Sequence, residues 1–193
     1  FDDTLSNWNL RGKVYFVTQR YELVLPPGEG ESPLSAYPPT VPMAKTWFAS
    51  LAGTWSEGLV NAIHVLWLLA VLIVTWSILR RFVSAGWASV GTYALISLPL
   101  FFLQGVNSYA DVVLSSYIVS AVGLLAVALV DKDELRMRSL LSVAVLFAAL
   151  LPFVRNEGLL LYLPMFCAVA GLGFLKRVVK KEVRWNPILF SVF

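Results

Sequence analysis

Acidic side chains stand beside the long apolar stretches of this chain, where their types and spacing could support chemistry. Asp2 and Asp3 are adjacent near its start, and Asp111 begins an apolar stretch. Carboxylates in such places can accept a proton from a hydroxyl group or hold a divalent cation. Aspartate is also favoured at the first turn of a helix, so helix capping explains the same residues without any chemistry.

A second polar group, Arg155-Asn156-Glu157-Gly158, interrupts the apolar sequence further along. Arg155 and Glu157 could simply pair with each other. Alternatively, the guanidinium of Arg155 could bind a phosphate group, because its planar N–H groups match two phosphate oxygens. The residue types leave both interpretations open.

The single histidine and the single cysteine restrict the chemistry. His64 follows Glu57 at a spacing that places both on nearly the same face of one helix. We expect a buried, hydrogen-bonded structural histidine there. One histidine and Cys167 cannot form the usual kind of zinc site. The sequence also has no glycine-rich nucleotide-binding loop and no Ser-His-Asp set.

The composition predicts the environment in which these residues lie. Of the 193 residues, 58% are hydrophobic and 14% are charged, whereas soluble domains carry about 25% charged residues. The expected fold class is therefore all-α, a polytopic transmembrane helix bundle. The chain begins at Phe1 rather than Met and ends in an apolar stretch, so we expect an internal part of a longer protein.

Five apolar windows could each form a membrane-spanning helix. A span needs about 20 apolar residues and must satisfy its backbone hydrogen bonds within itself. We expect residues 58–193 to contain about five spans and the start of another, and residues 1–57 to lie outside the membrane. The windows are 58–79, 82–110, 112–130, 139–154 and 158–175.

The basic residues predict the orientation of these spans. Most of the 15 lysines and arginines fall in short loops on one side of the alternating spans. This is the positive-inside pattern, which makes that side cytoplasmic, and it explains the net charge of +3 without a nucleic-acid partner. Asp2, Asp3, Asp111 and Glu157 then share the outer face. The inner basic residues are Arg80, Arg81, Lys132, Arg136, Arg138, Lys176, Arg177, Lys180, Lys181 and Arg184.

Residues 1–57 are expected to form an outer-face loop with amphipathic juxtamembrane helices. Residues 25–39 are rich in proline and glycine, which predicts irregular structure. Residues 41–53 predict an interfacial helix that lies on the membrane surface. Its apolar face would consist of Val41, Ala44, Trp47, Phe48 and Leu51, with Lys45 and Ser50 on the opposite face.

Four of these stretches, taken in order, resemble the GT-C class of polytopic glycosyltransferases, in particular the dolichyl-phosphate-mannose–protein mannosyltransferase and ArnT-like group. The resemblance covers most of residues 1–175. Phe1 stands where that group has an aromatic such as Trp, and Arg155 stands where Lys is more frequent. The motifs are Asp2-Asp3 followed by SNWN, Tyr37-Pro38-Pro39 with Pro42, Tyr109-Ala110-Asp111, and Arg155-Asn156-Glu157-Gly158.

The resemblance implies an inverting enzyme that moves a sugar from a polyprenyl-phosphate donor to an acceptor. The acceptor would be a glycan, a lipid or a protein. The enzyme would be a multi-pass protein of the bacterial inner membrane, with its active site on the outer, periplasmic face. Within that site, Asp3 would be the catalytic base, with Asp2 as the close alternative.

The resemblance also implies roles for the remaining polar residues. Asp111, Asn156 and Glu157 would bind sugar or acceptor hydroxyls, and Tyr37 would belong to the wall of the site. Arg155 or Lys45 would stabilise the charge that develops on the leaving lipid phosphate. If a divalent metal ion is used, Asp2, Asp3 and Asp111 would hold it.

Two other classes of protein compete with the enzyme. A transporter or lipid flippase subunit would carry charges within its spans, whereas here the acids gather at one face. A non-catalytic membrane scaffold would use the aspartates only as helix caps. An Asp3→Asn variant separates these, because asparagine caps a helix as well as aspartate does but cannot act as a general base.

Overall fold

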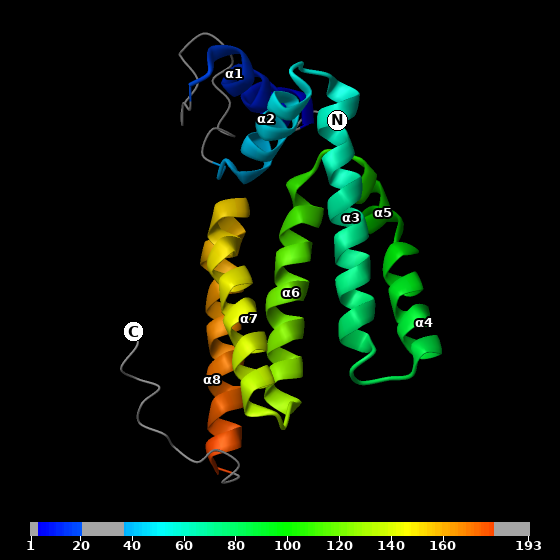
Figure 1. Cartoon of the computed structure of the whole chain (residues 1–193), viewed down its shortest axis with the longest axis vertical. Helices are drawn as coiled ribbons and strands as arrows, with labels where there is room; N and C mark the ends of the chain where they lie inside the picture. Colours follow the sequence, from blue (N-terminus) through cyan, green and yellow to red (C-terminus); the bar gives the residue numbers. More distant parts are fainter. Residues whose placement is uncertain (1–3, 21–36, 180–193) are drawn as a thin grey trace.

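The computed structural model describes residues 4–20 and 37–179, and this part of the chain is helical with no β-strand. A π-helical turn η1 (Thr4–Asn9) leads into α1 (Leu10–Thr18), and α2 (Thr40–Ala52) follows. The longer helices come after α2 and stand side by side below it (Figure 1). We refer to η1, α1 and α2 together as the cap.

Four helical segments of the described chain are long and apolar enough to cross a membrane. They are α3 (Glu57–Leu79), α6 (Ala110–Val130), α7 (Glu134–Val154) and the segment Gly158–Arg177, in which the π-helical turn η3 (Gly158–Tyr162) continues into α8 (Leu163–Val179). The sequence window 139–154 is short for a span, and the structure extends it backward to Glu134. These features are those of an integral membrane protein.

The expected span 82–110 is not one continuous helix. It forms α4 (Ala85–Ile96) and α5 (Pro99–Val106), which meet at a bend of 73°. Pro99 occupies the first turn of α5, where its missing N–H costs nothing, but it cannot continue the hydrogen-bond ladder of α4. The described chain therefore has four spans, or five if this bent pair counts as one.

α6 is the centre of the bundle, and it packs against α3 on one side and α7 on the other (Figure 1). Small residues line these contacts: Ala121 on α6 and Ala144 and Ala148 on α7 are buried. Small side chains let membrane helices approach closely and gain van der Waals contact. α6 is accordingly the most buried of the spans.

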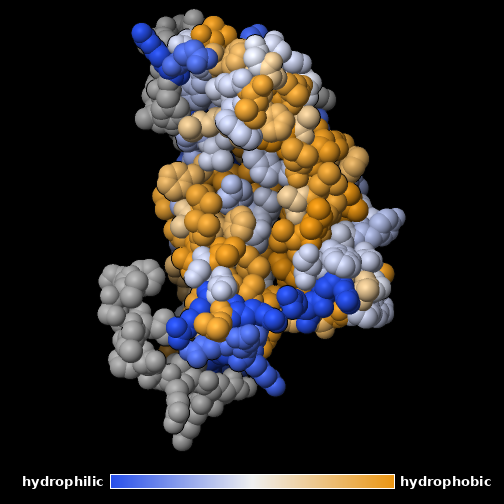
Figure 2. Space-filling model, in the orientation of Figure 1, coloured by the Kyte–Doolittle hydropathy of each residue, from blue (hydrophilic) through white to orange (hydrophobic). Residues whose placement is uncertain are grey.

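The outer surface of the bundle is apolar, as a lipid environment requires. Figure 2 shows hydrophobic residues covering the sides of the bundle and hydrophilic residues gathered at its lower end. Ile73, Leu146 and Leu160 are examples of large apolar side chains that are more than half exposed. The lower end carries the α3–α4 and α6–α7 connections with Arg80, Arg81 and Lys132. We call it the basic end, and the opposite one the cap end.

Close contacts hold the helices of the cap together and join the cap to the bundle. Gly12 allows α1 to approach α2, because a Cβ atom there would lie 3.1 Å from the carbonyl oxygen of Pro42 and 3.0 Å from the Trp55 ring. The hydroxyl of Thr40 donates a hydrogen bond to the carbonyl of Phe153 at the end of α7. The cap therefore sits directly over the ends of the spans.

Candidate functional site

Three charged residues meet where α6, α7 and η3 reach the cap end. Arg155 donates one guanidinium N–H to Asp111 and another to Glu157, the second at 3.1 Å. The side chain of Arg155 is 19% exposed, that of Asp111 35% and that of Glu157 47%. We call these residues, with Tyr37, the Arg155 cluster.

The local sequence explains how these side chains reach one another. Asp111 lies in the first turn of α6, whose N-cap residue Tyr109 makes no side-chain capping hydrogen bond, and the Asp111 carboxylate accepts a hydrogen bond from Arg155. Arg155 ends α7 with extended backbone. Gly158 then packs so tightly against α7 that a Cβ atom would overlap the carbonyl oxygen of Leu151. Only glycine permits this tight return from α7 into η3.

Tyr37 joins the cap to this cluster. Its ring lies under the guanidinium of Arg155, 5.4 Å from ring centroid to Cζ, a cation–π geometry. Its carbonyl accepts a hydrogen bond of 2.9 Å from Arg11 of α1, and its ring contacts Trp8 of η1 at 5.7 Å between centroids. Tyr37 is thereby fixed between the cap and the ends of the spans.

The electrostatics of the cluster are those of two carboxylates sharing one cation. Burial would lower the pKa of Arg155, but Asp111, Glu157 and Tyr37 raise it, so it stays positively charged. Its Nε–H is buried without a hydrogen-bond partner in the described chain. The cluster therefore offers partly exposed carboxylate oxygens to hydroxyl groups, while the Nε–H of Arg155 is closed off from solvent. A phosphate group would have to displace or share the carboxylates on Arg155.

A second polar cluster lies where the cap meets the start of α3. Lys45 of α2 donates to the side-chain oxygens of Asn9 and Asn61, the latter at 2.8 Å. Asn9 in turn donates a hydrogen bond to Glu57, which also accepts a hydrogen bond of 2.8 Å from the indole N–H of Trp55. We call this the Lys45 cluster. It ties η1, α2 and α3 together, and none of its hydrogen bonds involves the Arg155 cluster.

The environment of Lys45 corrects the sequence prediction for α2. Lys45 was expected on the solvent side of that helix, but its side chain is fully buried, together with Val41 and Ala49. Trp47 and Leu51 are 60% and 69% exposed. The side-chain oxygens of Asn9 and Asn61 accept hydrogen bonds from the buried ammonium group of Lys45. The face of α2 that carries Lys45 therefore packs toward the protein interior. Burial lowers the pKa of Lys45 to about 7, against the opposing effect of Glu57.

His64 also differs from the sequence prediction. It is buried, as expected, and its ring meets Trp67 edge-on at 5.4 Å between centroids. The expected hydrogen bond is not confirmed, however, because neither ring nitrogen has a partner in the described part of the chain. The side-chain amide of Asn7 and the indole N–H of Trp8 are likewise buried and unpaired there.

The remaining predicted site residues fall in three places. Asp2 and Asp3, the expected base and its alternative, lie outside the described residues. Asn156 is exposed in the turn beside Arg155. For a metal ion, residues 4–20 and 37–179 bring no three His, Cys, Asp or Glu side chains together, so the donors described at the Arg155 cluster do not by themselves fit a divalent cation.

Sequence reasoning missed most of the Lys45 cluster. Asn9 lies within the SNWN motif, which indicates no role for it, and Asn61 lies within the apolar window 58–79. The available signal was their spacing, because Glu57, Asn61 and His64 fall on one face of α3 at helical intervals. Polar residues on one stripe of a spanning helix indicate a face turned toward protein rather than lipid.

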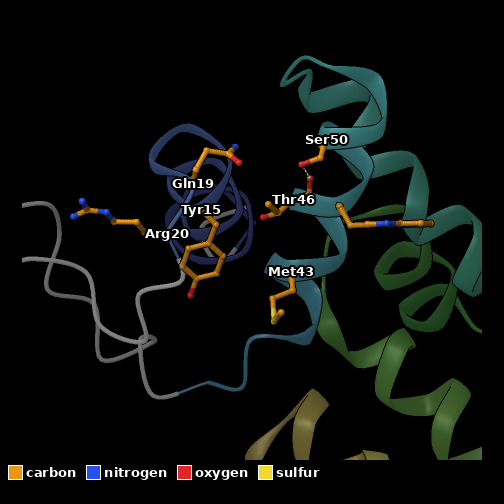
Figure 3. A pocket seen from close by; sticks show the side chains of 7 residues that line it. Tyr15, Gln19, Arg20, Met43, Thr46 and Ser50 are labelled. Carbon is orange, nitrogen blue, oxygen red and sulfur yellow. Dashed lines mark hydrogen bonds between the residues drawn. The ribbon is translucent and has the colours of Figure 1, made fainter.

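A shallow pocket of about 280 Å³ opens between α1 and α2 on the cap (Figure 3), and no residue of either cluster lines it. Thr46 and Met43 of α2 face Tyr15 of α1 and Gln19, the residue that follows α1, across it. It contains none of the predicted site residues. Its lining is Tyr15, Gln19, Arg20, Met43, Thr46, Trp47 and Ser50.

Comparisons with protein-family models, with curated proteins and with solved structures find no match to this chain.

Proposed function

We propose that this protein is an integral membrane glycosyltransferase that moves a sugar from a polyprenyl-phosphate donor to an acceptor at the outer membrane face. The observation that carries the proposal is the Arg155 cluster. Three sequence motifs, containing Tyr37, Asp111 and Arg155 with Glu157, converge on one guanidinium. A plain turn between two helices needs no such convergence.

The position of the cluster suits a lipid-linked donor. It lies at the ends of α6 and α7 beneath the cap, where a phosphate at headgroup level would meet protein. The apolar sides of the spans offer a surface for the polyprenyl chain. Only the sugar and the phosphate of such a donor would need to leave the bilayer, and its polyprenyl chain would stay there.

The proposed reaction is a single displacement with inversion. The acceptor oxygen attacks the anomeric carbon, and the bond from that carbon to the phosphate oxygen breaks. Polyprenyl phosphate leaves with the bonding electrons, and the acceptor proton passes to a carboxylate. The sequence resemblance assigns that base to Asp3, with Asp2 as its alternative.

The described residues would bind and orient the reactants. Asp111 and Glu157 would accept hydrogen bonds from sugar or acceptor hydroxyls, held in place by Arg155. Arg155 would donate a terminal guanidinium N–H to the leaving phosphate, shared with or taken from one of its two carboxylate partners, and this charge-assisted hydrogen bond would stabilise the developing negative charge. Lys45, buried in its own cluster, would act on this site through the placement of the cap rather than by direct contact.

A transporter or lipid flippase subunit remains the alternative function. Its support is the buried, unpaired His64 within α3, since a titratable group inside a span is a common element of ion pathways. Against it, the acidic and basic residues of the described spans all lie near the helix ends. That arrangement favours chemistry at the membrane surface over passage through it.

The test is donor turnover in membranes. Vesicles containing the protein would receive a mixed pool of polyprenyl-phosphate sugars, and the release of free polyprenyl phosphate would be followed. We expect release from the wild type and a loss of about 100-fold or more in Asp3→Asn, the usual effect of losing a general base. No release by the wild type from any donor would count against the enzyme and favour transport. Equal release from both proteins would keep the enzyme but return Asp3 to a capping role.

A further inference from the structure

A hollow at the basic end of the bundle is not used by the proposed reaction. It has a volume of about 650 Å³ and lies where α6 ends and α8 approaches it. Lys132, Lys176 and Arg177 line it together with Val130 and Asp131. We call it the basic pocket. It lies at the opposite end of the spans from the Arg155 cluster, so a ligand could bind there whether or not the protein is a glycosyltransferase.

The floor of the basic pocket is built by a close contact between α6 and α8. A Cβ atom on Gly173 would lie 2.5 Å from a terminal methyl group of Leu129, so a larger residue there would have to displace that side chain. Arg177 then reaches across α6 and donates to the carbonyl oxygens of Ala128 and Asp131, at 3.3 and 3.1 Å. Arg177 thus caps the C-terminal end of α6 and holds the pocket in shape.

The charges of the pocket are unbalanced. Lys132 and Lys176 are exposed, and neither forms an ion pair within the described part of the chain. The carboxylate of Asp131 accepts a hydrogen bond from the backbone N–H of Asp133. Two ammonium groups beside the Arg177 guanidinium and one carboxylate leave a net positive site.

The apolar surroundings point to a lipid rather than a small anion. Val130 and Leu129 line the pocket; Val130 is 61% exposed and Leu129 is half-buried. Hydrophilic residues gather at this end directly below the hydrophobic sides of the bundle (Figure 2). A ligand with an anionic head and apolar tails would contact both surfaces, whereas a free phosphate would use only the charges.

We propose that the basic pocket binds the headgroup of an anionic phospholipid, with Lys132 and Lys176 contacting the phosphate and the acyl chains lying against Val130 and Leu129. Basic pockets between helices on the cytoplasmic side are suited to such headgroups. The site would anchor the ends of α6 and α8 to the anionic leaflet.

Competitive lipid retention tests this site. The purified full chain in detergent would be mixed with equal amounts of phosphatidylglycerol and phosphatidylcholine carrying the same acyl chains. Native mass spectrometry would then count the retained lipids. We expect the wild type to retain phosphatidylglycerol preferentially. The Lys132→Gln, Lys176→Gln double variant should lose that preference by about fivefold for each lysine removed. Lys132→Arg with Lys176→Arg should keep it.

The matched control is Arg80→Gln with Arg81→Gln, which removes the same charge from the same end of the bundle but on the α3–α4 connection. This control should retain the preference. An equal loss in both double variants would overturn the proposal, because it would show attraction to the basic end as a whole. Displacement of the lipid by excess glycerol phosphate would also overturn it, by showing a small-anion site.

Discussion

The guanidinium of Arg155 and the carboxylate of Asp111 form an ion pair across 44 residues of sequence. The pair joins the end of α7 to the start of α6 at the cap end. Glu157 shares the same guanidinium, so one cation holds two carboxylates at the surface where the spans end. This arrangement accounts for the polar interruptions in an otherwise apolar chain.

Removing the cation of this cluster should destabilise the protein. Arg155→Met leaves Asp111 and Glu157 close together without a counter-charge. We expect a loss of about 2 kcal/mol in the free energy of unfolding, which is less than for a fully buried pair because both carboxylates are partly exposed. Thermal unfolding in detergent measures the change.

The control for that variant is Arg138→Met. Arg138 pairs with Glu134 one helical turn away, and both side chains are well exposed. Such surface pairs contribute about 0.3–0.5 kcal/mol. If Arg155→Met were no more destabilising than Arg138→Met, the Arg155 pair would not be a structural link between α6 and α7.

The turn at Gly158 should not tolerate a side chain. In Gly158→Ala the new methyl group meets the backbone of Leu151, which cannot yield as a side chain would. We expect a loss of about 1–3 kcal/mol in the free energy of unfolding from this overpacking.

Gly171→Ala is the matched change within α8, with open space around it. Alanine should stabilise the helix there by about 0.5–1 kcal/mol. Thermal unfolding of the two variants should therefore shift in opposite directions, and a shift in the same direction would contradict the packing described at Gly158.

The buried ammonium of Lys45 should make stability depend on pH. Its pKa is about 7 in the folded protein, against 10.5 for an unburied lysine, so the unfolded chain binds more protons between these values. Stability therefore rises with pH from about 7 upward, by at most about 1.4 kcal/mol per pH unit. Below pH 7 both states are protonated and this contribution is flat.

Unfolding temperatures measured in detergent from about pH 7 to about pH 9 test this dependence. Lys45→Met should remove the part of the slope that comes from Lys45, while Lys13→Met, which changes an exposed lysine of α1, should leave the slope unchanged. Identical slopes in all three proteins would mean that Lys45 is not held in a low-polarity site.

The apolar windows of the sequence predicted the spans well, because spanning helices in lipid are set by length and hydropathy alone. They did not predict the bend at Pro99, which divides the window 82–110 into two helices. The face of α2 was predicted wrongly because the polarity of Lys45 is satisfied by Asn9 and Asn61, which lie far away in sequence.

The candidate site was predictable in its residue types but not in its contacts. Asp111 and Glu157 were expected at one membrane face, and both lie at the cap end of the bundle. The sequence left open whether Arg155 would pair with Glu157, and it gave no indication of the contact with Asp111. That contact depends on α6 packing against α7, which hydropathy does not encode.

The most direct test of the proposed active site is polyprenyl-phosphate release by Asp111→Asn in membranes, compared with Glu134→Gln at matched expression. Asp111 lies in the Arg155 cluster, whereas Glu134 is an exposed carboxylate at the basic end of α7. We expect a loss of roughly tenfold or more for Asp111→Asn, the effect of losing a charged hydrogen bond, and unchanged release for Glu134→Gln. Full release from Asp111→Asn would contradict the assignment of the active site to the Arg155 cluster.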